Sequence, residues 1–220
     1  MLHPYTELRY VSPEIGYGVF ATCNIPMGTI IYASDDLEIC ITPDKYTTLD
    51  KNHREIVDKY SYIDAKGIRI VSWDHAKYIN HSCNCNTMST GYGFEIAIRD
   101  IKADEEITDE YGLFNIEEDT PINCGCINCR KYLYTNDLDT YGNQWDKKVQ
   151  PALQKVLQVE QPLWYLLDDK IYHQLLGYLA GEVEYRSVIA LKFTPTKTVN
   201  LHNNIASKKA KKLFKMSEAS

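Results

Sequence analysis

A short run of amide, imidazole and thiol side chains is the part of this sequence best equipped for chemistry. Residues 77–86 read KYINHSCNCN. Asn80 and His81 offer hydrogen-bond donors and acceptors at adjacent positions, and Cys83 and Cys85 add two thiols. Because Asn and Ser compete with the backbone for hydrogen bonds, we expect a half-buried loop that positions these groups, rather than a regular helix or strand.

Three further stretches carry patterns of their own. Residues 16–21 (GYGVFA) hold a glycine turn, residues 104–112 (DEEITDEYG) lead from an acidic turn to one tyrosine, and residues 124–129 (CGCINC) hold three thiols. Glycine lets the backbone approach a ligand closely, although a Gly-x-Gly pair alone is more often a plain hairpin turn. Three cysteines this close together favour metal ligation over disulfides in an intracellular protein.

In this order and at these separations, the four stretches resemble the SET-domain family of protein lysine methyltransferases. That family has a glycine turn, an Asn-His-Ser-Cys motif, a Glu-Leu-Thr-x-x-Tyr motif and a post-SET cysteine cluster. The resemblance covers roughly residues 10–130. It implies a fold that is mainly β with α, in which small β-sheets surround a knot-like crossing. The crossing would bring residues 80 and 111 together.

The resemblance also implies an activity. It is transfer of a methyl group from S-adenosylmethionine to the side-chain amine of a lysine in a protein, with histones among the candidate substrates. Such an in-line displacement gains most from positioning and from a fitted polar environment. Tyr111 matches the family tyrosine whose phenol lines the methyl path, and is the candidate catalytic residue. The matching cofactor-binding positions are Gly16, Tyr17, Gly18, Asn80, His81 and Tyr111.

Two tyrosines are candidates for lining the channel of the substrate lysine. They are Tyr60 and Tyr62, which precede the strand expected at residues 68–73. Tyrosine is abundant in this chain, at 17 residues, so simple packing explains each of them as well.

Zinc is the second cofactor that the resemblance implies. Cys124, Cys126 and Cys129 supply three thiolates, one short of a closed tetrahedral site. Cys83 matches the fourth ligand of the family, and Cys85 is its rival. One structural zinc ion would tie the cysteine segment over the active site.

Three positions depart from the family pattern. Cys85 stands where the family commonly has Pro, and with Asp109 it leans toward a binding module rather than an enzyme. Asp104 stands in a turn where the family usually has glycine. Asp109 stands two positions before Tyr111, where the family often has Phe or Tyr and where the number of methyl groups added is partly set. Asp109 therefore removes the usual basis for predicting mono-, di- or trimethylation. It also leaves room for an alternative function, a SET fold that keeps zinc and peptide recognition without turnover.

The charge balance bears on the partner. Residues 207–220 hold five Lys and one Glu, which leaves 19 basic and 29 acidic side chains elsewhere, a balance of −10. An acidic body suits a basic peptide better than a phosphate backbone, although it serves solubility equally well. We therefore expect a lysine-containing protein or peptide partner and no direct nucleic-acid binding.

Membrane and export signals are not expected. The sequence has no apolar run of about 18 residues, the length that a membrane-spanning helix needs. Its start lacks a basic region followed by an apolar stretch. We expect an intracellular protein, with cytoplasm and nucleus both open.

Hydrophobic patterns predict the elements that must position these groups. Strands are expected at residues 5–11, 19–21, 68–73 and 91–101, a turn and strand at residues 25–32, and some helix within residues 44–60. In the strand at residues 91–101, Phe94, Ile96 and Ile98 should share one face.

The C-terminal part changes character. Pro151 and Pro162 stand where helices can begin, leucines follow at helical spacing, and Gly181 is a plausible stop. A further helix or strand is expected at residues 186–193. The expected organisation is a SET domain at 1–115, a post-SET zinc segment at 116–135, a C-terminal helical region at 136–206 and a basic mobile tail at 207–220.

Overall fold

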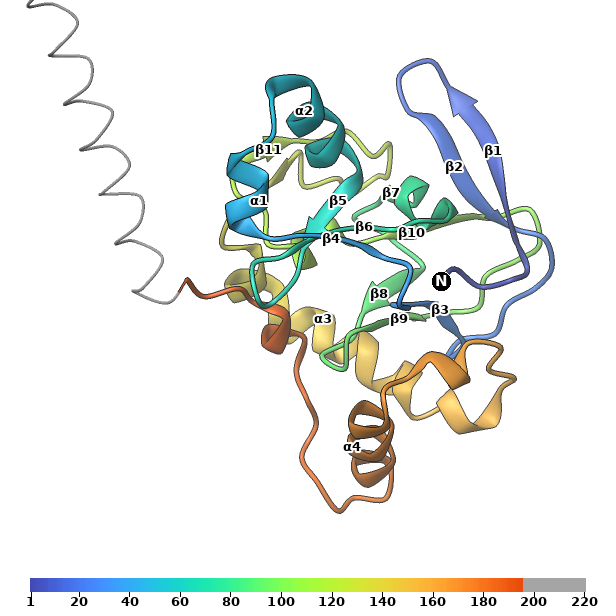
Figure 1. The fold of residues 1–220 in the computed structure, drawn as a ribbon. Helices are drawn as coiled ribbons and strands as arrows, with labels where there is room; N and C mark the ends of the chain where they lie inside the picture. Colours follow the sequence, from blue (N-terminus) through green and yellow to red (C-terminus); the bar gives the residue numbers. More distant parts are fainter. Residues whose placement is uncertain (196–220) are drawn as a thin grey trace, which may run out of the picture.

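Short strands form four small sheets in the computed structural model, which describes residues 1–195 (Figure 1). The strands are β1 Thr6–Ser12, β2 Gly16–Ala21, β3 Ile30–Ala33, β4 Ile39–Ile41, β5 Ser61–Ile63, β6 Arg69–Val71, β7 Asn80–His81, β8 Thr87–Ser89, β9 Phe94–Ala97, β10 Glu106–Asp109, β11 Thr120–Pro121 and β12 Tyr132–Leu133. The helices are α1 Pro43–Thr47, α2 Lys51–Tyr60, α3 Asp137–Leu153 and α4 Asp169–Leu179, with 3-10 turns at His75–Tyr78, Tyr111–Leu113, Val156–Gln158, Trp164–Leu166 and Val188–Leu191. The expected fold, mainly β with α and a C-terminal helical region, is confirmed.

The first sheet joins three of the four motif stretches. Its order is β1-β2-β10-β7. β1 and β2 form an antiparallel hairpin, β10 pairs antiparallel with β2, and β7 pairs parallel with β10. In the last pairing Thr108 lies opposite Asn80, and Asp109 lies opposite His81. The run at residues 77–86 is therefore not all loop, because two of its residues complete the edge of this sheet.

The central sheet, β3-β9-β8, is covered on both faces. Ile30 and Phe94 pack in one hydrophobic cluster with α3, whereas Ile31 and Ala97 pack in a second cluster with residues of the first sheet. All four residues of β9 are buried. The strand expected at residues 91–101 is therefore shorter than predicted, and its second face is buried as well, because the first sheet packs against it.

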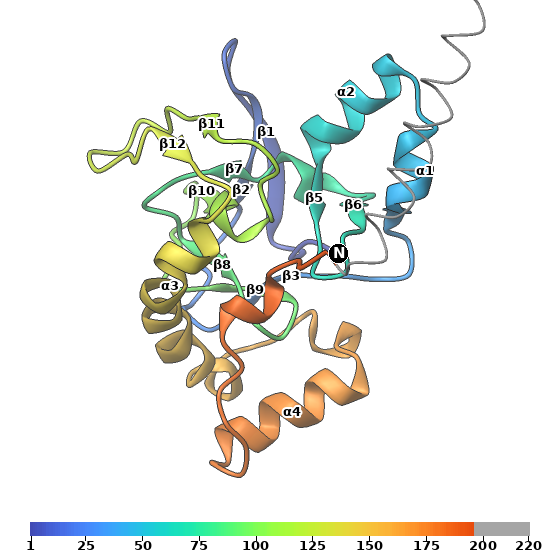
Figure 2. The ribbon, with the colours of Figure 1, turned by 90° about the vertical axis from the view of Figure 1, so that its left-hand side faces the viewer.

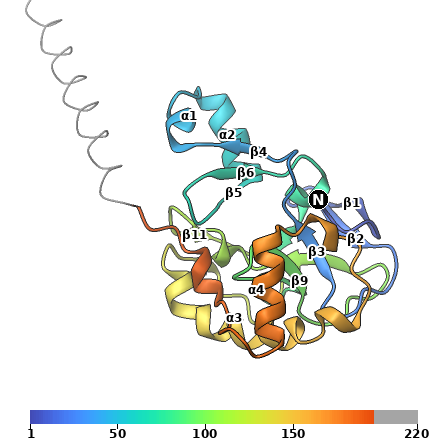
Figure 3. The same cartoon turned by 60° about the horizontal axis from the view of Figure 1, so that its bottom comes forward.

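The third sheet, β4-β6-β5, lies at the end of the molecule that carries α1 and α2 (Figure 3). The α3 and α4 helices lie on the other side of the central sheet (Figure 2). The helical content expected within residues 44–60 is confirmed by α1 and α2. Their starts are capped by side chains, since Thr42 and Asp50 accept backbone N–H bonds from the first turn of each helix.

The expected helix starts at the prolines are wrong. The α3 helix begins at Asp137 and contains Pro151 near its C-terminal end. The α4 helix begins at Asp169, where the Asp168 carboxylate accepts the N–H groups of Lys170 and Ile171. The aspartate cap, rather than Pro162, sets this start, because it satisfies backbone donors that would otherwise be unpaired.

The C-terminal segments pack on the core of the sheets. Trp145, Leu153, Leu175 and Val188 share one hydrophobic cluster with Phe94 of β9. The stop at Gly181 is confirmed, since this residue follows the end of α4 with φ of +74°. Residues 188–191 form a 3-10 turn, and the basic tail expected at 207–220 lies outside the described residues. None of the helices in the described part is long and apolar enough to cross a membrane.

Candidate functional site

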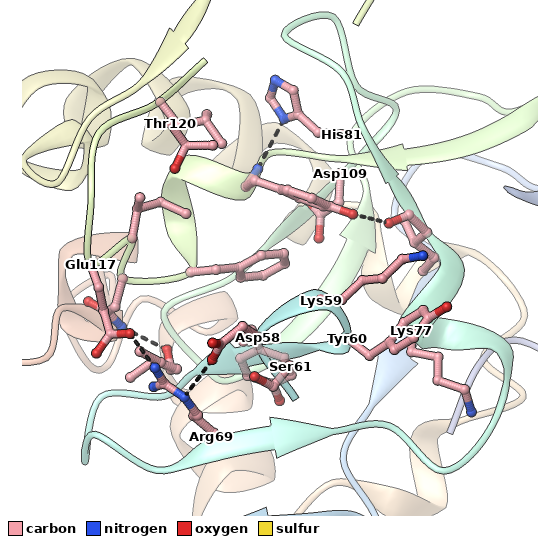
Figure 4. A pocket seen from close by; sticks show the side chains of 18 of the residues that line it. Asp58, Lys59, Tyr60, Ser61, Arg69, Lys77, His81, Asp109, Glu117 and Thr120 are labelled. Atoms are coloured by element: carbon pink, nitrogen blue, oxygen red, sulfur yellow. Dashed lines mark hydrogen bonds and ion pairs between the residues drawn. The ribbon is translucent and has the colours of Figure 1, made fainter. Parts of the chain in front are cut away.

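A pocket of about 790 Å³ opens between the third sheet and the segment that follows β10. Its wall combines aromatic rings with acidic and basic side chains, and Figure 4 shows most of them. The lining includes Tyr32, Tyr60, Tyr62, Arg69, Lys77, His81, Glu95, Asp109, Tyr111, Phe114 and Glu117. Tyr60, Tyr62, His81 and Tyr111 were all predicted from the sequence as site residues.

Tyr111 is fixed at both ends. Its hydroxyl donates to the carbonyl of Ile79 at 2.6 Å, and its backbone N–H donates to Nδ1 of His81 at 3.2 Å. Burial raises the pKa of the Tyr111 phenol, and the nearby Asp109 and Glu95 add to this rise. The phenol therefore stays protonated at neutral pH. The expected meeting of residues 80 and 111 is confirmed to within one residue by the bond to Ile79.

His81 is a neutral positioning group in this arrangement. Burial lowers its pKa. Its Nδ1 accepts the Tyr111 N–H, so the ring hydrogen lies on Nε2, which faces the Cys83 sulfur at 3.3 Å. His81 thus connects the Tyr111 backbone with the cysteine segment.

Asn80 holds the glycine turn. Its Nδ2 donates to the Tyr17 carbonyl at 3.1 Å and to Oε1 of Glu106 at 2.7 Å. A Cβ on Gly18 would collide with that same Glu106 oxygen and lie 3.0 Å from Asn80 Nδ2. A larger residue at position 18 would therefore have to displace the Glu106 carboxylate, whereas the close approach to a ligand that the sequence suggested stays a prediction.

The glycine turn reaches the pocket through a row of rings. The Tyr17 ring lies 6.1 Å from that of Tyr78, which lies 5.6 Å from Tyr60. Lys77, which the sequence analysis did not single out, is tied back by its Nζ to the carbonyls of Trp73 and Asp74 at 3.2 and 2.9 Å. Tyr60 and Lys77 line the pocket, whereas the glycine turn, Tyr78 and Asn80 do not.

The other ring row belongs to the deeper part of the pocket. Tyr62 lies 5.3 Å from Phe114, which lies 5.5 Å from Tyr111. Burial raises the pKa of Tyr62 to about 12. Buried Tyr32 donates its hydroxyl to Glu38 at 2.5 Å. Tyr32 and Phe114 were missed, because a single aromatic residue in a strand or turn has no local signal that separates lining from packing.

Arg69 lies in the part of the pocket wall that also carries acidic side chains. Its Nη2 pairs with Glu117, its Nε lies 3.5 Å from Asp58, and its guanidinium lies 3.9 Å from the centre of the Tyr46 ring (Figure 4). This cation is therefore already neutralised by carboxylates from two different segments.

Two buried carboxyl groups line the pocket beside Tyr111. Asp109 is 1% exposed and Glu95 is 8% exposed. Burial raises the pKa of Asp109 to about 7 and raises that of Glu95 well above its ordinary value. Glu95 was missed, because an acidic residue that alternates with Phe94 and Ile96 in a strand normally faces solvent.

The cysteine segment folds back onto the loop after β7. The Cys124 sulfur accepts the Cys83 N–H at 3.5 Å and lies 3.4 Å from the Cys126 sulfur. Donor atoms of His81, Cys83 and Cys124 all lie within 4.8 Å of one another. Burial alone would raise the pKa of Cys124, but hydrogen bonds from the Cys83 and Cys126 backbones and from the Cys126 and Cys129 thiols lower it to about 6.

This donor set fits a soft, tetrahedral metal ion. Thiolates are the ligands that structural zinc prefers, and one thiol of the cluster already loses its proton easily. Cys85 lies elsewhere, 3% exposed within the hydrophobic core. Burial raises the pKa of that thiol well above its ordinary value. The placement therefore favours Cys83 over Cys85 as the fourth donor.

A buried ion pair anchors the cysteine segment. Arg130, directly after Cys129, donates to both oxygens of Glu110 at 2.7 and 2.8 Å and lies 3.3 Å from Asp137 of α3. Both carboxylates are 1% exposed. Arg130 therefore links the end of β10, the cysteine segment and the C-terminal helices. The sequence analysis did not single it out.

Comparison with known proteins gives one family match. Residues 16–112 match the SET domain model. This range contains the glycine turn, the Asn-His-Ser-Cys stretch and the stretch that ends at Tyr111, and it ends before the cysteine cluster.

Solved structures with detectable similarity include two of KRYPTONITE. The complex with mCHG DNA and SAH is 23% identical with a TM-score of 0.42, over 59% of this chain and 29% of that chain. The complex with mCHH DNA, H3(1-15) peptide and SAH is 21% identical with a TM-score of 0.43, over 60% and 30%. A Plasmodium falciparum protein, named as a candidate histone methyltransferase, is 19% identical with a TM-score of 0.37, over 50% and 95%. This chain thus spans less than a third of the KRYPTONITE chains.

The family match coincides with the geometry. It begins at the glycine turn that Asn80 holds and ends at the segment that carries Tyr111 into the pocket. Residues 16–112, a little under half of the chain, are therefore similar to a SET domain in both sequence and the placement of these motifs.

Proposed function

We propose that this chain is an S-adenosylmethionine-dependent protein-lysine N-methyltransferase. The observation that carries the proposal is the position of Tyr111, whose hydroxyl is tied to the Ile79 carbonyl beside Asn80 and whose ring faces a tyrosine-lined pocket. An in-line transfer to an amine needs such a fixed polar group and a channel that excludes water. Tyr111 is the proposed catalytic residue.

The proposed cofactor side is the glycine turn and its neighbours. Gly16, Tyr17 and Gly18 would offer backbone groups, and Asn80 and His81 would contact the cofactor beside Tyr111. The close packing of Gly18 on Asn80 supports this assignment. When bound, the cofactor supplies the methyl group. Tyr60 and Tyr62, which line the pocket, would face the substrate lysine chain.

A structural zinc ion is proposed at Cys83, Cys124, Cys126 and Cys129. The contacts among the Cys83, Cys124 and Cys126 groups support it. The ion would hold the cysteine segment beside His81 and would leave no open position for chemistry. The corresponding proposed boundaries are a SET unit at 1–115, a zinc segment at 116–135 and a helical region from 136.

The proposed partner is a lysine-containing protein or peptide, with histones as one candidate class. The acidic balance of residues 1–206 supports a basic partner. The absence of direct nucleic-acid binding, and an intracellular location, stay predictions.

The test is methyl transfer from labelled S-adenosylmethionine to a panel of histones and to whole-cell protein extract. We expect label on lysine with the wild type and about 10²-fold less with Tyr111→Phe, because one fixed polar group at the reacting centre is removed. Tyr185→Phe is the matched control, since Tyr185 is also a partly buried phenol, bonded to Asp146 at 2.8 Å, and does not line the pocket. Equal loss in both variants, or no loss in Tyr111→Phe, would contradict the role of Tyr111.

A second candidate function is a SET-fold binding module without turnover. Asp109 favours it, since a carboxyl group replaces the aromatic ring common at that position in the family. Cofactor and peptide binding without label on any protein would support this alternative.

A further inference from the structure

Two buried carboxyl groups lie together in the wall of the pocket. Glu95 lies on β9 of the central sheet and Asp109 lies on β10 of the first sheet, and both line the pocket with Tyr111. In the described part of the chain, Glu95 Oε2 and Asp109 Oδ2 are fully buried oxygens with no hydrogen-bond partner. Buried polar atoms are nearly always paired, so these two oxygens need either a proton shared between the two carboxyl groups, which can hydrogen-bond to each other, or a donor that enters the pocket.

The surroundings do not neutralise the pair. Among residues 1–195, neither Glu95 nor Asp109 takes part in a salt bridge of the kind that holds Glu110. The Asp109 Oδ1 atom accepts the Glu110 N–H at 2.6 Å, so only one of its oxygens is committed.

The titratable groups that act most directly on the pair are Tyr62 of β5, the Cys85 thiol, Tyr111, Glu110, and the N-terminal ammonium of Met1, which acts on Glu95 from a distance. The wall of the same pocket also carries four basic side chains, and within residues 1–195 none of them forms a salt bridge with the pair; they are Lys59, Arg69, Lys77 and His81. Glu110 is itself paired with Arg130.

Two adjacent carboxyl groups in a buried place cannot both ionise, so they share one proton over a wide pH range. The remaining negative charge then lies beside the phenol of Tyr111, which carries no charge. A pocket whose wall carries this shared negative charge favours a cation with N–H donors over a neutral or anionic group.

We propose that Glu95 and Asp109 together accept the proton of the substrate ammonium group, a role that rests on the proposed methyltransferase function. The lysine ammonium donates one N–H proton to the carboxylate of the pair, which becomes a carboxylic acid. The lone pair of the resulting amine forms the new C–N bond to the methyl carbon. The C–S bond breaks, and its electron pair stays on sulfur. The product is a methylammonium ion, and the pair returns its proton to solvent through the pocket.

The first experiment needs no methyl transfer. Side-chain carboxyl ¹³C resonances are assigned with Glu95→Gln and Asp109→Asn, and the wild type is titrated with n-butylammonium chloride and, separately, with n-butanol. We expect saturable shifts of both carboxyl resonances with the ammonium ion only, and loss of the response in the double variant. Carboxyl resonances that ignore the ammonium ion, or respond equally to n-butanol, overturn the proposal whether or not the protein is a methyltransferase.

The second experiment measures kcat against pH on whichever protein the wild type labels. Asp109→Asn should keep the contact with the Glu110 N–H, because its amide oxygen still accepts. We expect kcat to fall about 10²-fold or more near pH 7. The deficit should shrink as the pH approaches the pKa of free lysine, about 10.4, because the amine then arrives unprotonated. A fall that is equal at every pH would show a structural role only and would overturn the proposal.

A matched control removes a buried carboxylate elsewhere. Asp146 of α3 accepts from Tyr185, Ser187 and the Val188 N–H, and Asp146→Asn can keep most of these bonds. We expect wild-type kcat and an unchanged pH profile from this variant. If the wild type labels no protein at all, the proposed function fails, and the carboxyl titration alone then decides whether the pair binds an ammonium group.

Discussion

Arg130→Ala should destabilise the protein more than any loss of a surface ion pair. The guanidinium makes a bidentate contact to Glu110 at 2.7 and 2.8 Å and lies 3.3 Å from Asp137. The exposed fractions of the side chains are 16% for Arg130 and 1% for each carboxylate. Truncating Arg130 leaves two buried carboxylates without their cation.

The magnitude follows from that burial. Removal of one partner of a buried pair costs about 3–5 kcal/mol, because the other charge stays buried and unpaired. The guanidinium also lies 4.8 Å from the centre of the Tyr141 ring, which adds roughly 0.5–1 kcal/mol. The sum is a large fraction of a typical unfolding free energy of about 5–15 kcal/mol. It should lower the urea midpoint by roughly 1–2 M.

Arg9→Ala is the matched control for this experiment. Arg9 also contacts two carboxylates, Glu7 and Asp104, and also lies near an aromatic ring, Phe20, at 5.1 Å. Only its exposure differs, since Arg9 is 35% exposed and its partners are 48% and 77% exposed. Its loss should cost far less than the loss of Arg130, because solvent screens exposed ion pairs.

The assay is urea unfolding at pH 7, with added zinc and again with a chelator, so that metal loss is not mistaken for loss of the ion pair. The double variant Arg130→Met with Glu110→Gln should recover much of the stability, because it removes one buried charge from each side. The reasoning is refuted if Arg130→Ala costs no more than Arg9→Ala, or if the double variant is no more stable than the single one.

Three further outcomes are expected. Purified protein should hold about one zinc ion per chain, and Cys126→Ser should lose it; well-folded wild type without metal by elemental analysis would contradict the site. Gly18→Ala should weaken S-adenosylmethionine binding in calorimetry, since its Cβ would displace the Glu106 carboxylate that Asn80 contacts. Unchanged affinity would count against the cofactor-binding role of the glycine turn. Burial raises the Asp109 pKa from 3.8 to about 7, so the folded state binds this proton more tightly than the unfolded state. The stability that this proton contributes is full below pH 4 and is lost as the pH rises through 7. Thermal unfolding of Asp109→Asn should therefore show a smaller loss of stability between pH 5 and 8 than the wild type does, and parallel stability curves for the two proteins would refute the assignment.

The local sequence pattern correctly predicted the elements that are stabilised by local contacts. The hairpin of β1 and β2 follows from alternation around a glycine turn, and the end of α4 follows from Gly181, whose positive φ suits glycine. The helix starts failed for a local reason as well. Pro151 and Pro162 were given more weight than the cap at Asp168, although a cap satisfies orphan donors and a proline only tolerates their absence.

The burial of Glu95 could not be read from alternation. The pattern places Glu95 on the face opposite Phe94 and Ile96, which is correct, but it does not say what covers that face. The cover is the first sheet, whose strands come from residues 6–21 and 80–109. A second buried face arises from packing between segments distant in the sequence, and no window of the chain contains both sides of it.

The same distinction between local and non-local signals applies to the residues of the candidate site. Asn80, His81 and Tyr111 were identifiable because a family resemblance carries non-local information that propensities lack, and the two-residue pairing of β7 with β10 brings them together. Arg130 had no such support. Its partners lie 20 residues before it and 7 residues after it, in elements that meet only after the cysteine segment has folded back.

Because of these contacts, the position of Tyr111 and the conformation of the cysteine segment depend on each other. Cys83 follows His81 by two residues, and His81 accepts the N–H of Tyr111. On the other side, Arg130 follows Cys129 and holds Glu110, the residue before Tyr111. Tyr111 therefore lies between two connections that both begin at the cysteine cluster. Loss of the cysteine cluster should therefore displace Tyr111 in the pocket through both connections, whereas loss of Arg130 should displace it through only one.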